Sequence, residues 1–232
     1  MGETHEAAPL RALLLYYSYT GQSRTVLQAA GEVLRDNGFE VQEAAVELTD
    51  PRYAKPFARF PMRRVWPDML SVLPAQVRRA DARVAVPDVV REGGFDLVCI
   101  GSPTWWSTAS LPIRSFLRST DARKLLARRQ FAVFVVCRDS WRGNLAAVRR
   151  LAEWQGGRYA GEIHLTYPGD QLRSMLSLTS YLGSGRYRAR YAGVRIPVTN
   201  VQPEQLDRVR DFAADLAERT RAEVIACRAN SM

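Results

Sequence analysis

Two residue types that build many enzyme sites are scarce in this chain of 232 residues. The three cysteines, Cys99, Cys137 and Cys227, are isolated and do not have the spacing of a zinc site or a redox pair. The only histidines are His5 and His164, so a histidine-based catalytic triad is hard to assemble. We therefore expect neither structural disulfides nor zinc, and we expect the chemistry to come from a bound cofactor.

Long hydrophobic runs are missing as well. No apolar run is long enough to cross a bilayer, and residues 1–9 lack the basic start and apolar centre of a signal peptide. This pattern predicts a cytoplasmic protein. The hydrophobic content of 47% and the charged content of 25% are typical of a folded chain, which we expect to form a single domain over residues 1–232.

Lysine is rare, yet the chain is basic. Lys55 and Lys124 are the only lysines among 33 basic residues, and the net charge is +9, so arginine supplies nearly all of the positive charge. A positive balance favours anionic partners. The arginines occur as scattered pairs rather than as a dense stripe, so we expect no nucleic-acid binding and interpret most of them as solvated surface. Peripheral contact with a membrane surface stays open.

Apolar runs and amphipathic stretches alternate along the chain. The runs at 97–100 and 131–136 lack the polar alternation of a half-exposed strand, which indicates strands covered on both faces. Alternating strands and helices predict a parallel sheet between two layers of helices. The expected strands are 12–17, 39–46, 96–101, 131–137 and 160–166, and the expected helices are 24–37, 69–80, 111–119, 143–155 and 203–226.

Two long segments, about 50–95 and 167–200, do not belong to a minimal alternating fold. The first contains six prolines and the second four glycines, so apart from the helix at 69–80 we expect loops there. Loops of this length in a compact domain are usually functional or disordered. Both segments are rich in aromatic residues, which argues against disorder. We interpret them as two insertions.

Residues 18–23, Ser-Tyr-Thr-Gly-Gln-Ser, lie between the first expected strand and the first expected helix. The first turn of a helix has unpaired N–H groups and a partial positive charge, so it stabilises an anion. The hydroxyls of Ser18, Thr20 and Ser23 add donors, and Gly21 allows a close approach of the backbone. Because this stretch contains no lysine or arginine, it suits a phosphate monoester better than a nucleoside triphosphate with its metal.

Two further loops follow the third and fourth expected strands. Residues 101–108 read Gly-Ser-Pro-Thr-Trp-Trp-Ser-Thr, and residues 137–144 read Cys-Arg-Asp-Ser-Trp-Arg-Gly-Asn. In a doubly wound sheet the carboxyl ends of neighbouring strands meet at one edge, so both loops should lie beside residues 18–23. Their aromatic rings suit a flat apolar ligand.

With these three loops, the sequence resembles the flavodoxin-like superfamily. Residues 18–23 match its phosphate-binding motif, and residues 101–106 resemble the second flavin loop of its NAD(P)H-dependent FMN oxidoreductase branch. The two insertions resemble those of flavodoxin-fold proteins known as dialkylresorcinol-condensing enzymes. The resemblance implies a flavodoxin-like doubly wound five-stranded parallel sheet with two long insertions, with FMN as cofactor and NAD(P)H as co-substrate.

The resemblance also implies a set of cofactor-binding residues. Each tryptophan of the set either flanks the flavin ring or packs elsewhere, and Asn144 either donates to FMN or caps a helix. Arg138 either stabilises an anionic reduced flavin or is a surface arginine. Tyr191 or Tyr187 could supply a proton, which makes Arg138 and Tyr191 the catalytic candidates. The cofactor-binding set is Ser18, Tyr19, Thr20, Gly21, Gln22, Ser23, Pro103, Thr104, Trp105, Trp106, Cys137, Arg138, Trp141 and Asn144.

An FMN-dependent oxidoreductase is therefore the function that the sequence favours. It would use NAD(P)H to reduce a quinone or another conjugated small molecule, a reaction that requires no histidine. A flavodoxin-type electron carrier is an alternative, against which the basic charge and the insertions count. A flavin-free binding or regulatory protein and a quinone-linked enzyme on a membrane surface also stay open. We expect a homodimer that acts on a small molecule.

Overall fold

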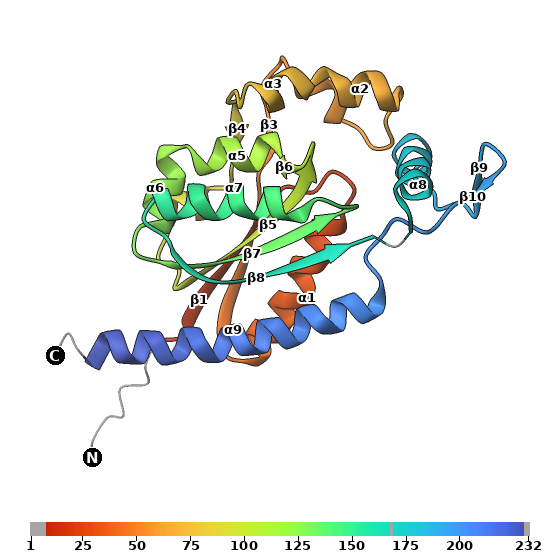
Figure 1. The fold of residues 1–232 in the computed structure, drawn as a ribbon. Helices are drawn as coiled ribbons and strands as arrows, with labels where there is room; N and C mark the ends of the chain where they lie inside the picture. Colours follow the sequence, from red (N-terminus) through yellow and green to blue (C-terminus); the bar gives the residue numbers. More distant parts are fainter. Residues whose placement is uncertain (1–7, 168, 230–232) are drawn as a thin grey trace.

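The computed structural model describes residues 8–167 and 169–229, and one parallel sheet forms its centre (Figure 1). The sheet order is β2-β1-β5-β7-β8, and each pairing along this path is parallel. This order and direction confirm the predicted doubly wound five-stranded sheet. The strands are β1 (Leu10–Tyr16), β2 (Phe39–Ala45), β5 (Leu97–Trp105), β7 (Gln130–Cys137) and β8 (Arg158–Thr166).

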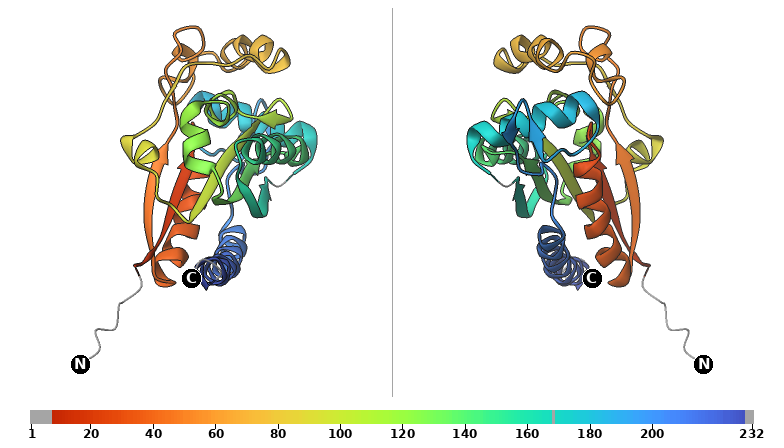
Figure 2. Two further views of the ribbon diagram at one scale, coloured as in Figure 1. Left: turned by 90° about the vertical axis from the view of Figure 1, so that its left-hand side faces the viewer. Right: turned by 90° about the vertical axis from the view of Figure 1, so that its right-hand side faces the viewer.

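Helices cover both faces of the sheet (Figures 1 and 2). α1 (Gln22–Asp36) and α9 (Pro203–Ala229) pack on one face, and α5 (Leu111–Leu117) and α7 (Trp141–Trp154) pack on the other. Successive residues of a strand point to opposite faces, so Leu14 packs in the core under α1 and α9, and its neighbour Leu15 packs in the core under α5 and α7. This double burial explains the uninterrupted apolar runs. Within the described ranges, none of the helices has the length and hydrophobicity that crossing a bilayer requires.

Prolines and a serine shift the bounds of two predicted helices. The helix expected at 69–80 is split into α2 (Val65–Ser71) and α3 (Leu73–Val77). Pro67 and Pro74 each lie in a first helical turn, where a missing N–H needs no partner, so each favours a helix start rather than a continuous helix. The helix expected at 111–119 ends at Leu117. Ser119 then begins α6 (Thr120–Leu126), because its Oγ accepts a 3.2 Å hydrogen bond from the N–H of Ala122.

The second insertion contains a helix that the sequence analysis missed. Where a loop was predicted, α8 spans Gln171–Ser184. Asp170 caps its first turn through a 2.8 Å hydrogen bond from the N–H of Arg173, and Gly185 ends it at a φ of +67°. The prediction of a loop is therefore wrong for this stretch, although the sequence contains both the capping residue and the glycine that mark the ends of the helix. The remainder of the insertion includes the short hairpin of β9 (Arg190–Tyr191) and β10 (Val194–Arg195).

The first insertion is closed at its base by a short antiparallel pair. β3 (Glu47–Leu48) pairs with β4 (Val84–Ala85), and between them lie η1 (Lys55–Phe57), α2 and α3; α4 (Asp88–Glu92) follows β4. The buried carboxylate of Asp50 accepts hydrogen bonds from the Arg52 side chain and the Arg83 N–H at 2.8–3.0 Å. These bonds hold the pKa of Asp50 well below its usual range. The insertion is thus anchored to the domain at both ends.

Strand β5 is longer than the sequence predicts. A loop was expected after residue 101, but β5 continues to Trp105 and turns back as β6 (Thr108–Ala109). At the turn, Trp106 and Ser107 have φ values of +50° and +60°. A two-residue hairpin turn of this type requires positive φ at both central positions, because only then does its twist match that of the strands. We refer to residues 104–109 as the β5–β6 hairpin.

The tip of the β5–β6 hairpin lies against the first turn of α7 at Gly143. A Cβ atom at Gly143 would overlap the carbonyl oxygen of Ser107, a backbone atom that cannot rotate away. Helix propensity alone would make alanine more stable than glycine here by about 1 kcal/mol. We expect the overlap to reverse that sign, so that Gly143→Ala lowers the free energy of unfolding by about 1–3 kcal/mol in a urea titration. A variant more stable than the native chain would contradict this close approach.

Candidate functional site

Three loops meet at the carboxyl end of the sheet, as the strand order requires. Residues 17–21 follow β1, the turn of the β5–β6 hairpin follows β5, and residues 138–140 follow β7. Figure 1 shows α8 beyond the tips of β7 and β8 and α2 above the same edge. Residues from all of these elements line a cavity of about 380 Å³. This volume is in the range of sites for drug-sized ligands.

The loop before α1 leaves the first turn of that helix open. Gly21, at a φ of +83°, is the N-cap residue and has no side chain to cap the helix, whereas Ser119 and Asp170 cap α6 and α8. The Oγ of Ser18 accepts a 3.2 Å hydrogen bond from the first-turn N–H of Arg24. Among the described residues, no acceptor is recorded for the N–H groups of Gln22 and Ser23. These donors and the dipole of α1 therefore remain available to an anion.

Two residues of this loop are also tied to the insertions. The Oε1 of Gln22 accepts a 2.8 Å hydrogen bond from the N–H of Val201, and its Nε2 donates to the hydroxyl of Tyr187 at 3.2 Å. The Tyr19 hydroxyl donates to the carbonyl of Arg59 at 2.6 Å, and burial raises the pKa of Tyr19 to about 12. Both contacts position the loop rather than provide chemistry.

The three tryptophans of the predicted loops lie in different surroundings. Trp106 lines the cavity and is 37% exposed, so one of its faces is accessible to a ligand. Trp105 is only 8% exposed, and its ring stacks on Phe57 with 4.7 Å between ring centroids. Trp141 is not part of the lining, because it stacks on His164 at 3.7 Å. Trp106 is therefore the tryptophan best placed to flank a flat ligand.

Asn144 has a structural position. Its side chain is fully buried, and its Oδ1 accepts a 2.9 Å hydrogen bond from the hydroxyl of Ser102. Its Nδ2 donates to the carbonyl of Ser102 at 2.9 Å and to the hydroxyl of Thr104 at 3.0 Å. The amide thus joins α7 to β5. It neither lines the cavity nor caps a helix. Its role in the structure is therefore to join these two elements, which differs from both roles that the sequence suggested, donation to FMN and helix capping.

Arg138 and Asp139 are the charged residues of the described lining. Arg138 donates to the hydroxyl of Ser174 at 3.3 Å and to the side chain of Gln171, both neutral acceptors at the start of α8. Asp139 accepts from the N–H of Ser140 and from Gln171, and these hydrogen bonds lower its pKa. The cavity therefore holds one guanidinium whose recorded hydrogen bonds go to neutral groups, next to a carboxylate that stays ionised.

Most of the predicted cofactor-binding residues come together at this cavity. Eleven of the fourteen line it, and Gly21, Trp141 and Asn144 do not. Tyr191 lies in β9 outside the lining, and Tyr187, also outside the lining, contacts Gln22 and stacks on Tyr181. The eleven are Ser18, Tyr19, Thr20, Gln22, Ser23, Pro103, Thr104, Trp105, Trp106, Cys137 and Arg138.

The remaining wall comes from residues that the sequence analysis did not single out. Met175, Leu178 and Leu182 share one face of α8, at the spacing of three and four residues that marks a helix face. That spacing is visible in the sequence and could have indicated a helix with one apolar face here. Tyr167 also lines the cavity, and burial raises the pKa of its phenol, so the hydroxyl stays protonated and can donate a hydrogen bond. The first insertion adds Phe57, Met62, Val65, Trp66 and Met69.

The two insertions meet each other over the cavity. The N–H of Met62 donates to the carbonyl of Leu182 at 2.8 Å, and the rings of Phe60 and Tyr181 lie 5.3 Å apart. We refer to residues 57–69 and 175–182 together as the roof. A roof made mainly of methionine, leucine, valine and aromatic side chains gives the cavity an apolar upper wall.

Solved structures that are similar to this fold include a flavoprotein and a flavodoxin. A flavoprotein in complex with FMN from Lactobacillus acidophilus NCFM has a TM-score of 0.52 and 16% identity, covering 67% of this chain and 93% of that chain. A flavodoxin from the domain Archaea has a TM-score of 0.51 and 13% identity, covering 91% of this chain and 99% of that chain. No family model and no curated protein matches the sequence. With the observed strand order, these similarities show that the chain has the flavodoxin-like fold.

A substitution at Asn144 separates a structural role from a ligand-binding one. We expect Asn144→Leu to lower the free energy of unfolding by about 2–4 kcal/mol in a urea titration, because buried partners at Ser102 and Thr104 lose their hydrogen bonds. As a control, Gln28→Leu should change it by less than about 0.5 kcal/mol, since the recorded hydrogen bonds of that amide, both to Glu43, are long at 3.4 Å. Unchanged stability in Asn144→Leu, together with weaker ligand binding, would contradict the structural assignment.

Proposed function

We propose that this protein is an FMN-dependent oxidoreductase that uses NAD(P)H to reduce a quinone or another conjugated small molecule. The observation that carries this proposal is the roofed cavity at the carboxyl end of the sheet. Its floor is polar and offers donors for an anion, whereas its roof is apolar. A ligand with a phosphate at one end and a flat ring at the other suits this division of polarity.

The donor set fits FMN. The open first turn of α1, with the hydroxyls of Thr20 and Ser23, would hold the phosphate through neutral donors. Trp106 and the neighbouring Thr104 of the β5–β6 hairpin would flank the ring system. When bound, FMN supplies the acceptance and release of a hydride, which the chain's own side chains cannot provide.

The chain's own residues would bind the substrate and exclude water. The roof removes water from the upper wall, which strengthens electrostatic interactions inside the cavity. Arg138 places positive charge on a site where reduction adds negative charge, so it would favour the reduced, anionic form of the cofactor. The apolar side chains of the roof favour a hydrophobic substrate over a charged one.

The roof also supports a reductase over an electron carrier. A carrier exchanges electrons with another protein, which requires the edge of its cofactor to be accessible to a large surface. Here two segments that are distant in sequence, joined by the hydrogen bond between Met62 and Leu182, cover that edge of the sheet. A small molecule can enter such a cavity, whereas a second protein surface cannot.

The purified protein tests the proposal directly. We expect a flavin absorbance spectrum, and we expect stopped-flow mixing with NADPH and a quinone to oxidise NADPH at a rate that saturates with quinone. Thr20→Ala/Ser23→Ala should weaken FMN binding by about tenfold or more, because two hydroxyl donors to the phosphate are lost. Urea titrations of the two proteins provide the control for folding.

Three results would count against the proposal. Protein that remains colourless after incubation with FMN would exclude the cofactor. Reduction in two separate one-electron steps, without turnover of quinone, would favour an electron carrier. An equal loss of stability and FMN affinity in the double variant would mean that residues 18–23 act only in folding.

The charge of Arg138 has a measurable consequence. We expect Arg138→Gln to make the two-electron reduction potential of bound FMN more negative by about 30 mV, which corresponds to about 1.4 kcal/mol. Glutamine can still bond to Ser174 and Gln171, so the variant removes the charge and keeps a polar contact. Arg138→Lys should restore most of the potential, as measured by redox titration. A potential that is the same in all three proteins would make Arg138 an ordinary surface arginine.

A further inference from the structure

A second cavity, of about 250 Å³, lies on the far side of the β5–β6 hairpin from the first. Thr108 of the hairpin lines this second cavity, whereas the preceding Trp106 and Ser107 line the first. Four arginines line it, and its described lining includes no acidic residue. They are Arg79 from the first insertion, Arg114 and Arg118 from α5 and just beyond it, and Arg150 from α7.

Arg114 is a buried cation without a carboxylate partner among its recorded bonds. Its side chain is 3% exposed, and it donates to the Oε1 of Gln76 at 2.5 Å and to the carbonyls of Ala80 and Ala75 at 2.9 and 3.2 Å. Its Nε has no hydrogen-bond partner within the described residues. Burial and the charges of Arg118 and Arg79 lower the pKa of Arg114, and the nearby Asp81 carboxylate offsets only part of this effect.

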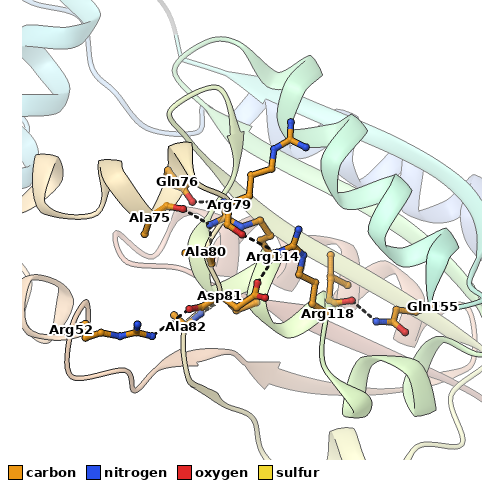
Figure 3. A network of polar contacts seen from close by, with 12 residues as sticks. Arg52, Ala75, Gln76, Arg79, Ala80, Asp81, Ala82, Arg114, Arg118 and Gln155 are labelled. Carbon is orange, nitrogen blue, oxygen red and sulfur yellow. Dashed lines mark hydrogen bonds and ion pairs between the residues drawn. The ribbon is translucent and has the colours of Figure 1, made fainter.

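One carboxylate stands near this cluster, and it is already paired. Asp81 accepts a 2.9 Å hydrogen bond from Arg118, which also donates to the carbonyl of Arg79 at 2.9 Å. Figure 3 shows Arg114 and Arg118 reaching towards the carbonyls of this segment, while the side chain of Arg79 extends away from them. After the pairing of Arg118 with Asp81, three guanidinium charges remain around the cavity.

Arg79 and Arg150 line the cavity from two different elements, the first insertion and α7. No hydrogen bond or ion pair is recorded for either guanidinium in the part of the chain that the structure describes. Arg79 also has a φ of +52°, an uncommon conformation for a residue with a long side chain. The backbone at Arg79 is held there by Arg118, whereas its own guanidinium is left for another partner.

We propose that this arginine cavity binds the phosphate group of a small molecule. Guanidinium groups match phosphate oxygens in charge and in geometry, because each presents paired N–H donors in one plane. A solvated surface would account for Arg79 and Arg150 alone. It does not account for the nearly fully buried charge of Arg114, whose recorded hydrogen bonds all go to neutral acceptors. A phosphate dianion would compensate that charge and give the two free arginines their partner.

The arginine cavity is connected to the first cavity through Gln76. Its Oε1 accepts from Arg114, and its Nε2 donates to the carbonyls of Trp105 and Ala109 at 3.1 Å each. Gln76 therefore links Arg114 to the hairpin that separates the two cavities, and Thr108 of that hairpin lines the arginine cavity itself. The phosphate could belong to a free phosphorylated molecule or to the extra phosphate of NADPH. Only the second source rests on the proposed function.

Calorimetric titration of the full chain with pyrophosphate tests the site without any enzymatic readout. We expect binding in the native protein and an affinity at least about tenfold lower in Arg79→Gln/Arg150→Gln, which removes two charge-assisted contacts. The matched control is Arg78→Gln/Arg129→Gln, which removes the same charge from exposed arginines outside the lining. Its affinity should stay within about twofold of the native value, since only the general attraction changes.

A further variant separates this site from residues 18–23, which also offer donors to phosphate. Thr20→Ala/Ser23→Ala should retain the pyrophosphate affinity that depends on Arg79 and Arg150. The proposal is overturned if the native chain does not bind pyrophosphate, if both arginine pairs reduce binding equally, or if only the Thr20/Ser23 variant reduces it. Circular dichroism and a urea titration check that each variant is folded.

Parallel titrations with NADP⁺ and NAD⁺ identify the source of the phosphate. A preference for NADP⁺ that disappears in Arg79→Gln/Arg150→Gln assigns the site to the dinucleotide. Equal binding of the two dinucleotides, together with arginine-dependent pyrophosphate binding, assigns it to a free phosphorylated molecule. Either result supports the phosphate site, and the second does so even if NAD(P)H is not a substrate.

Discussion

Two buried amide side chains fix the β5–β6 hairpin, and the arrangement of both cavities depends on them. Asn144 holds the strand side of the hairpin from α7 through Ser102 and Thr104. Gln76 holds the carbonyls of Trp105 and Ala109 from α3. Between them the turn packs directly against Gly143 of α7, so closely that a Cβ atom at Gly143 would overlap the backbone of the turn. Because these hydrogen bonds hold the hairpin on both sides, its backbone has little freedom to move, and it places Trp106 at one cavity and Thr108 at the other.

The two insertions change what a flavodoxin-like sheet can do. The loops at its carboxyl end offer hydroxyls, backbone N–H groups and one guanidinium, which suit an anionic ligand, beside the carboxylate of Asp139. Above them the insertions supply Met62, Met69, Met175 and Leu182, which suit an apolar one. Polar recognition thus comes from the shared fold, and apolar recognition comes from segments that a minimal version of the fold does not require. The chemistry that we propose needs both.

The sequence predicts the sheet well because local and global preferences agree there. Runs such as 131–136 are apolar without alternation, short, and rich in valine and phenylalanine, which together favour a strand buried on both faces. The site is predicted less completely. Trp141 and Asn144 are of the residue types expected around a flavin. In the structure, however, Trp141 stacks on His164 and Asn144 is hydrogen-bonded to Ser102, and these partners lie 23 and 42 residues away along the chain. Such pairings arise from tertiary packing, and no local pattern encodes them. The helix α8 is different, since Asp170 and Gly185 mark its ends in the sequence.

The roof consists of two halves that are separated by more than a hundred residues and are joined by the Met62–Leu182 hydrogen bond and by the packing of Phe60 on Tyr181. Each half covers the apolar face of the other. If either were absent, the remaining half would present methionine, leucine and aromatic side chains to water, which favours aggregation and exposes the segment to proteolysis. The two insertions therefore depend on each other for the burial of their apolar side chains.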